Sequence, residues 1–149
     1  MALIVSGVEI ARPPEEVFGY VTDPSTFGDW QSGVVSGHVE GDGPPRVGSR
    51  CVMIRRIGGA ERTSVSEITQ IAPPGAWAIR GVDGPIRADV NVAVEPVSNG
   101  QGAHVTISLD FHGHGIGKVL LPMVVRQARK EVPRSCQKLK KLLEAGVNR

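Results

Sequence analysis

The C-terminal segment Gly115–Ala145 constrains the fold most, because it is the only long stretch with helical spacing. Pro133 lies within this pattern, so we expect a kink near Arg129–Pro133 and a helix that continues beyond it. Gly146 follows the last apolar residue and suits a C-terminal cap. The apolar residues recur at steps of three and four and form one stripe of an amphipathic helix: Leu121, Val125, Ala128, Val132, Cys136, Leu139 and Leu143.

The chain before this helix consists of short segments with strand-like alternation. Ile86–Val97 is the clearest, since its apolar and polar residues alternate strictly from Ile86 to Val92. Turn residues such as Gly58-Gly59 separate the segments, and this short spacing indicates an antiparallel sheet with one buried face. The expected strands are Ala2–Ile10, Val34–Glu40, Val47–Ile57, Ala60–Ile71, Ala76–Val82, Ile86–Val97 and His104–Phe111.

Two short helices are expected between the first two strands. Pro13-Pro14 followed by Glu15-Glu16 suits a helix start, because proline tolerates the first turn and carboxylates favour the positive end of the helix dipole. Asp23-Pro24 ends this helix, and Ser25–Asp29 forms a second, shorter turn. The order of elements predicts an α+β domain over residues 1–149, in which a curved antiparallel sheet of about seven strands wraps around the C-terminal helix.

Composition and charge narrow the possible environments. No apolar run approaches the length of a membrane span and no secretory signal opens the chain, so we expect a cytoplasmic protein without membrane insertion. The net charge is +2, yet nine Lys or Arg face two Glu between Lys118 and Arg149. A basic helix can attract nucleic acid or anionic lipid. Because the helix lacks aromatic residues for base stacking, we expect no nucleic-acid partner and favour a solvated outer face.

Three segments resemble the START-like, polyketide cyclase/dehydrase superfamily. They are PPEEVFGYVTDPSTFGDWQSGV (residues 13–34), VSEITQIAPPGAWAIRG (residues 65–81) and EVPRSCQKLKKLLE (residues 131–144), and they occur in the family's order. The resemblance implies the helix-grip fold, with a cavity between sheet and helix for a small hydrophobic ligand. It leaves function broad, because that superfamily includes lipid carriers, hormone receptors, aromatic cyclases, chaperone activators and toxin-like members of toxin–antitoxin pairs.

Ligand-binding candidates are the side chains expected to face this cavity. The facing of strand Val47–Ile57 is ambiguous, because Cys51 and Met53 lie on one face while Val52 and Ile54 lie on the other. An arginine of this strand that reached the cavity mouth would suit a ligand carboxylate or phosphate. The candidates are Phe27, Met53, Arg55, Ser66, Ile68, Val90, Val92, Leu109, Phe111, Leu120, Val124 and Gln127.

Catalytic and metal-binding candidates are few. Glu67 would be a general acid or base if it faced an apolar cavity, whereas an ion pair with Arg80 or Arg62 is the structural alternative. His112 and His114 share a strand face and could reach one metal, but the flanking glycines favour a strand that runs into a turn. We therefore predict no metal and no cofactor.

The sequence thus predicts binding or transport of a lipid, fatty acyl or polyketide-like ligand by a monomer or homodimer. One alternative is a cyclase or dehydratase, although no nucleophile–base–acid set, phosphate-binding loop or CxxC motif is present. A second alternative is a toxin-like interaction protein. A third is a cavity filled by bulky side chains, which the sequence leaves open.

Overall fold

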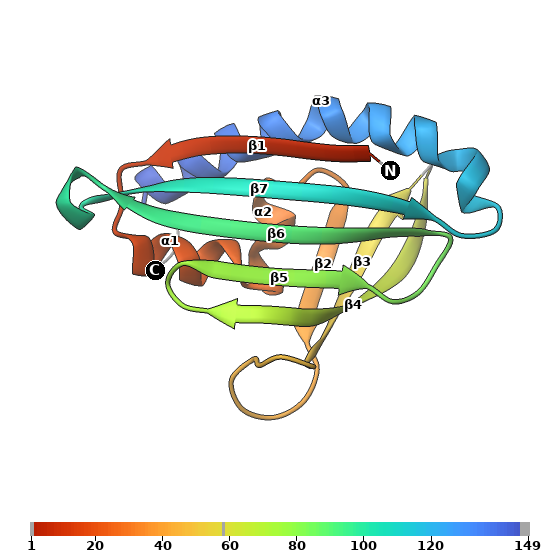
Figure 1. The fold of residues 1–149 in the computed structure, drawn as a ribbon, viewed down its shortest axis with the longest axis horizontal. Helices are drawn as coiled ribbons and strands as arrows, with labels where there is room; N and C mark the ends of the chain where they lie inside the picture. Colours follow the sequence, from red (N-terminus) through yellow and green to blue (C-terminus); the bar gives the residue numbers. More distant parts are fainter. Residues whose placement is uncertain (1, 58, 147–149) are drawn as a thin grey trace.

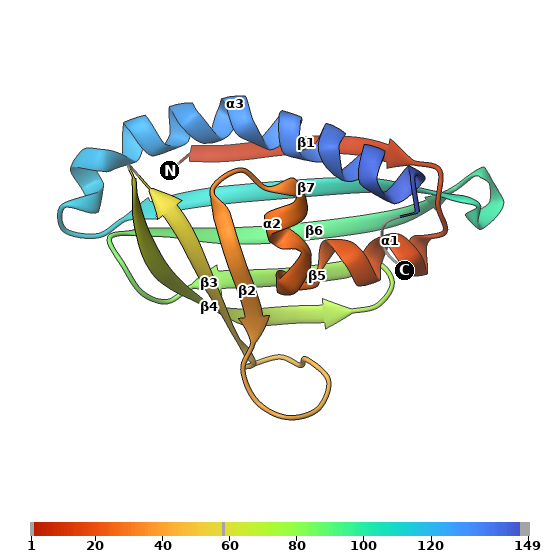
Figure 2. The same cartoon turned by 180° about the vertical axis from the view of Figure 1, so that it is seen from behind.

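The computed structural model describes residues 2–57 and 59–146 and shows a curved sheet gripping one long helix (Figures 1 and 2). The elements follow in the order β1 (Ala2–Ile10), α1 (Pro14–Val21), η1 (Pro24–Thr26), α2 (Phe27–Trp30), β2 (Val34–Val39), β3 (Arg50–Ile57), β4 (Ala60–Ala72), β5 (Ala76–Gly81), β6 (Ile86–Val97), η2 (Ser98–Gly100), β7 (Gly102–Gly113) and α3 (Gly117–Glu144). The predicted helix-grip architecture is confirmed.

All seven strands join one antiparallel sheet in the order β1-β7-β6-β5-β4-β3-β2. Strand β3 begins at Arg50, three residues later than expected, because residues 40–49 form a long connection that projects from the sheet (Figure 1). The predicted hairpin turn includes Gly58, which lies outside the described residues. Helix α3 packs along the inner, concave side of the sheet, chiefly against β1 and β7.

Strand register settles which side chains face inward. Cys51 and Met53 are buried (0% and 2% exposed), so Arg55, two residues further along β3, shares the inner face. On β4, the residues paired with Cys51 and Met53 are Ser66 and Ser64. The ambiguity of strand β3 is therefore resolved, with Arg50, Val52, Ile54 and Arg56 on the outer face.

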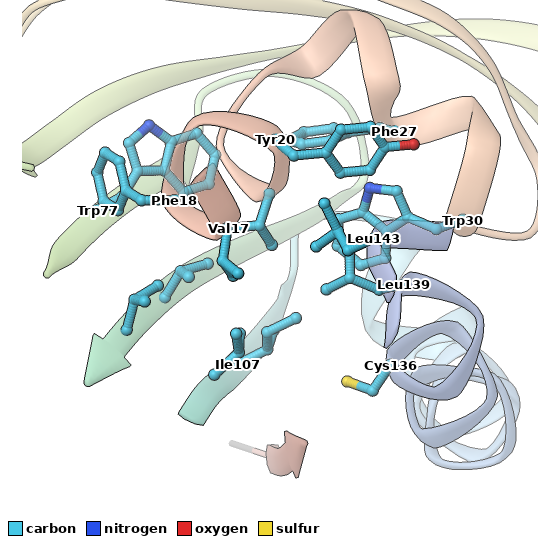
Figure 3. Packing of buried hydrophobic residues seen from close by; sticks show 14 of the residues in the cluster. Val17, Phe18, Tyr20, Phe27, Trp30, Trp77, Ile107, Cys136, Leu139 and Leu143 are labelled. Carbon is cyan, nitrogen blue, oxygen red and sulfur yellow. The ribbon is translucent and has the colours of Figure 1, made fainter. Parts of the chain in front are cut away.

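The larger core cluster fills one end of the space beneath α3, which we call the closed end. Figure 3 shows α1 and α2 contributing side chains to this cluster opposite the C-terminal half of α3, whose Cys136, Leu139 and Leu143 are buried. Trp30 packs edge-on against Phe27, with ring centroids 5.8 Å apart. Phe27 makes a similar contact with Trp77 at 6.1 Å. Trp30 is thus part of the packed core.

A smaller cluster lies beneath the N-terminal half of α3, which we call the open end. Only three of its members are buried, namely Ile4, Phe111 and Val125. The remaining members are half-buried: Ile86, Ala88, Leu109, Leu121, Val124, Ala128 and Val132. Helices α1 and α2 lie nearer the other end, so α3 is the only described helix over this part of the inner face (Figure 2).

Two glycines fix the ends of α3. A Cβ on Gly117 would lie 1.9 Å from the carbonyl oxygen of Pro85, so only glycine allows the helix to start against the β5–β6 turn. The helix then continues through Pro122 and Pro133, as predicted for Pro133. Gly146 has φ 85° and donates its N–H to the Leu143 carbonyl at 3.0 Å, which confirms the predicted cap.

Candidate functional site

Three neighbouring strands carry apolar side chains on the inner face where the open end meets the larger cluster. Val90 of β6 lies between Ile79 of β5 and Leu109 of β7 in the strand register. Two residues before Val90, Ala88 of β6 pairs with Phe111 of β7. On the neighbouring strands, Ser66 of β4 pairs with Gly81 of β5. Val90, Leu109 and Ser66 are half-buried. This part of the sheet is therefore a mainly apolar surface that its own helix covers only partly.

Two arginines oppose each other on the inner face at the rim of this surface. Arg55 of β3 is the direct cross-strand partner of Arg62 of β4. Like charges directly opposite each other in a sheet repel. Neither side chain has an ion-pair partner within residues 2–57 and 59–146. Desolvation by burial lowers the pKa of Arg55. Burial of this side chain therefore disfavours the charged form of the guanidinium group.

A third donor lies at the closed end. The indole Nε1 of Trp30 is buried and has no hydrogen-bond partner among the described residues. A buried N–H without an acceptor costs free energy, so such donors are uncommon in folded proteins. The Arg55, Arg62 and Trp30 side chains are hydrogen-bond donors only. At the rim of the open end, Arg55 and Arg62 favour a ligand that supplies acceptors, such as a carboxylate or carbonyl group, whereas Trp30 lies apart from them at the closed end.

The sequence-predicted lining residues divide between the two ends. Phe27, Met53, Ile68 and Val92 are at most 4% exposed and belong to the larger cluster, where they serve as packing. Phe111 is buried in the smaller cluster. The half-buried candidates are Arg55, Ser66, Val90, Leu109, Leu120 and Val124.

Gln127 does not face the inner space. Its side chain is exposed and its Nε2 donates to Glu131 Oε1 at 2.8 Å, one helical turn further along α3. The expectation of an inward Gln127 rested on its place beside the apolar stripe. Helix α3 packs chiefly against β1 and β7, and the exposure of Gln127 shows that its position lies outside this contact.

Glu67 lies on the outer face of β4, next to the buried, inward Ile68. Its carboxylate Oε1 is 3.6 Å from Arg80 Nη2 on β5, which is the structural ion pair considered from the sequence. Arg62, the other partner considered, points to the opposite face. The general acid or base role required an inward Glu67, and strand parity places it on the wrong side of the sheet for that role.

His112 and His114 separate where β7 ends. His112 Nε2 lies 3.1 Å from Asp89 Oδ2 and 3.8 Å from Asp110 Oδ2 on the outer face. His114 lies in the following turn, where its backbone N–H donates to the Pro85 carbonyl at 2.8 Å. No group of three His, Cys, Asp or Glu side chains in the described part of the chain is arranged to hold a metal ion.

Two open hollows lie on other faces of the molecule. One is on the outer face of the sheet and is lined by Arg80, Gly81, Val82, Arg87, Asp89, His112 and His114. The other lies on the outward side of α3 around Pro133. None of the described helices is both long and apolar enough to span a bilayer.

Residues 1–144 match the family model described as polyketide cyclase / dehydrase and lipid transport. The chain belongs to this family. The resemblance seen in three sequence segments is thereby confirmed over nearly the whole chain, although no curated protein matches it.

Solved structures share the fold of this family member. The di-domain ARO/CYC BexL from the BE-7585A biosynthetic pathway superposes with a TM-score of 0.77 at 17% identity, covering 100% of this chain and 48% of BexL. The chain therefore spans about half the length of that protein. The protein TTHA0849 from Thermus thermophilus gives 0.75 at 17% identity, with 97% and 99% covered. A START superfamily protein from Mycobacterium smegmatis gives 0.68 at 17% identity, with 96% and 94% covered.

Sequence reasoning missed part of this site. Arg62 was considered only as a partner of Glu67, and Leu121 only as part of the helix stripe. The signal for Arg62 was present, since a tight hairpin at Gly58-Gly59 pairs residues at equal distances from the turn and so sets Arg62 opposite Arg55.

Proposed function

We propose that this protein binds a small apolar ligand with an anionic or carbonyl group in the open end, beneath the N-terminal half of α3. The observation that carries the proposal is the half-buried apolar surface of Leu109, Leu121 and Val124 beside the unpaired Arg55–Arg62 rim. Burial of the ligand's apolar part contributes about 25 cal/mol per Å² before ordering costs. The anionic group would relieve the repulsion between the two guanidinium groups.

A lipid, a fatty acyl chain or a polyketide-like chain satisfies this requirement. All three combine a hydrocarbon or poorly solvated chain with carbonyl or carboxylate oxygens. The family's description, which joins polyketide cyclases and lipid transport, covers the same chemistry. Binding or carriage of such a ligand requires only burial and the donors at the rim, and it needs no catalytic set.

Cyclisation or dehydration of a polyketide-like chain is the second candidate, and Arg55 is the observation that favours it. An inward guanidinium can polarise a carbonyl oxygen during such a reaction. The reaction also needs a proton acceptor, and the strand residues that face the open end include serines but neither carboxylate nor imidazole, since Glu67, Asp89 and Asp110 face outward. Simple binding therefore fits the described side chains better.

The test is a titration of the purified protein with a fluorescent fatty acid, together with native mass spectrometry for a co-purified lipid. Arg55→Met should weaken binding of the fatty acid about tenfold or more, because a charge-assisted hydrogen bond is lost. Arg56→Met is the matched control, because Arg56 is the next residue but faces outward and pairs with Glu61 at 3.0 Å. Equal affinities for the two variants, or no binding by the wild type, would count against the proposal.

A further inference from the structure

The outward face of α3 begins with exposed apolar side chains. Ile116, directly before the helix, is 65% exposed, while Val119 and Met123 in its first two turns are 74% and 65% exposed. Val119 and Met123 are four residues apart and so lie one above the other on the same side of the helix. They point away from the inward stripe, and no described element covers them. Transfer of exposed apolar side chains of this size from water into an apolar phase lowers the free energy of the system.

The same face continues with positive charge. Arg126 and Lys130 follow Met123 at steps of three and four, so they extend the line of Val119 and Met123 along α3. Helix α3 carries eight Lys or Arg against two Glu. Of these cations, only Lys140 forms an ion pair within the described residues. Further along, exposed Arg134, Lys138 and Lys141 surround the hollow at Pro133.

We propose that this outward face of α3 docks on the surface of an anionic lipid bilayer. The apolar first turns would enter the boundary between headgroups and acyl chains, and the basic residues behind them would contact lipid phosphates. An interfacial helix needs this combination of a compact apolar part and flanking cations, and it lies in the plane of the membrane. Docking of this kind therefore does not require a helix that crosses the membrane.

Nucleic acid fits this face less well than a bilayer does. The positive charge suits both partners, but a phosphodiester backbone offers nothing to Ile116, Val119 and Met123. Helix α3 also contains no aromatic side chain for base stacking. The proposal is independent of the proposed ligand, because docking requires only the outer face of α3.

The experiment is co-sedimentation of the purified full chain with phosphatidylcholine vesicles, with and without phosphatidylglycerol. The protein should bind the mixed vesicles, bind the neutral vesicles weakly and dissociate as salt is raised. The vesicles themselves supply lipid, a class proposed as the ligand, so variants on the outward face of α3, which leave the open end unchanged, separate docking from ligand uptake. Failure to bind the mixed vesicles at low salt would overturn the inference.

Matched variants locate the contact. Val119→Asp should lower vesicle binding about tenfold or more, because it removes an apolar contact and adds a negative charge. Val47→Asp is its control, since Val47 is 61% exposed but lies in the connection between β2 and β3, across the molecule from α3 (Figure 1). Both side chains are exposed, so both variants should keep the wild-type circular dichroism spectrum and melting temperature.

A second matched pair tests the charge. Arg126→Ser should weaken vesicle binding about fivefold, since one cation near an anionic surface contributes about 1 kcal/mol. Arg46→Ser, in the same β2–β3 connection as Val47, should leave binding unchanged. Equal losses in each variant and its control would overturn the proposal. Binding of duplex DNA or RNA that depends on Arg126, without vesicle binding, would also overturn it and assign the face to nucleic acid.

Discussion

The two halves of α3 carry the same apolar spacing but meet different surroundings. At the closed end, Leu139 and Leu143 are fully buried because α1 and α2 fill the space between helix and sheet (Figure 3). At the open end, Val125 is buried, but Leu121, which occupies a position on the stripe equivalent to that of Leu139, remains half-buried. Helical periodicity therefore predicts which residues face inward, but whether a third layer covers them decides how deeply they are buried.

This difference arises from one connection in the chain. The segment between β1 and β2 folds into α1, η1 and α2, and all three are short enough to pack at one end of the curved sheet. Two hydrogen bonds from side chains to backbone carbonyls join α3 to the β1 segment at the same end. Arg12 Nε donates to the Leu143 carbonyl at 2.9 Å, and Lys140 Nζ donates to the Glu9 carbonyl at 2.8 Å. The N-terminal half of α3 has no comparable support among the described residues.

Matched leucine truncations on α3 should give the largest difference between the two ends. Leu139→Ala should lower the free energy of unfolding by about 2–5 kcal/mol, because it leaves a cavity in a close-packed cluster. Leu121→Ala should cost about 1 kcal/mol, since the side chain is half-buried and its neighbours already contact solvent. Urea unfolding of both variants measures the two values. Equal losses would show that the open end is packed as tightly as the closed end.

A partly buried hydrogen bond sharpens the description of the closed end. Tyr20 donates its hydroxyl to Asp29 Oδ2 at 3.0 Å, and burial, helped by the Asp29 carboxylate, raises the pKa of Tyr20 to about 12. The folded state therefore holds this proton more tightly than the unfolded state, whose tyrosine titrates near 10.0. This contribution to stability is complete below pH 10 and is lost as the pH rises toward 12.

Tyr20→Phe should lower the free energy of unfolding by about 1–2 kcal/mol at neutral pH. Between pH 10 and 12, wild-type stability should fall more steeply than that of Tyr20→Phe, and urea unfolding across this range measures both slopes. Burial also raises the pKa of Cys51 to about 11, but this thiol is present in both proteins and cancels in the comparison. Parallel slopes would argue that the phenol does not bond the carboxylate.

The smallest effect is expected at the C-terminal end of α3. Glu144 accepts hydrogen bonds from Lys140 Nζ at 2.7 Å and from the Ala11 N–H at 2.9 Å, and these contacts lower the pKa of the carboxyl group. Because the folded-state pKa is lowered, the contribution to stability is present above the unfolded value of 4.5 and is lost as the pH falls below it.

Glu144→Gln should therefore cost less than about 1 kcal/mol at neutral pH, as exposed ion pairs usually do. The difference from wild type should vanish in acid, which urea unfolding at several pH values would reveal. A constant difference at every pH would exclude the charge as its cause. Fatty acid binding should not change, because the substitution lies at the closed end.

Much of the fold follows from the sequence, while the site follows from it only in part. Alternation along Ile86–Val97 predicted the facing of Val90 and Val92, and the register with β7 agrees. Strand β3 resisted this reasoning, because Cys51 and Val52 are both apolar and neighbouring strands decide which one is covered. Burial depth depends on the third layer, so no pattern in the sequence distinguished Leu109 from Val92.

The central claim is that the open end, and not the closed end, receives the ligand. The direct test is a two-dimensional NMR titration of methyl-labelled protein with a medium-chain fatty acid. The account predicts that methyl signals of Leu109, Leu121 and Val124 shift together, while those of Val17, Leu139 and Leu143 stay in place. Shifts centred on Leu139 and Leu143, or no shifts at saturating fatty acid, would contradict it.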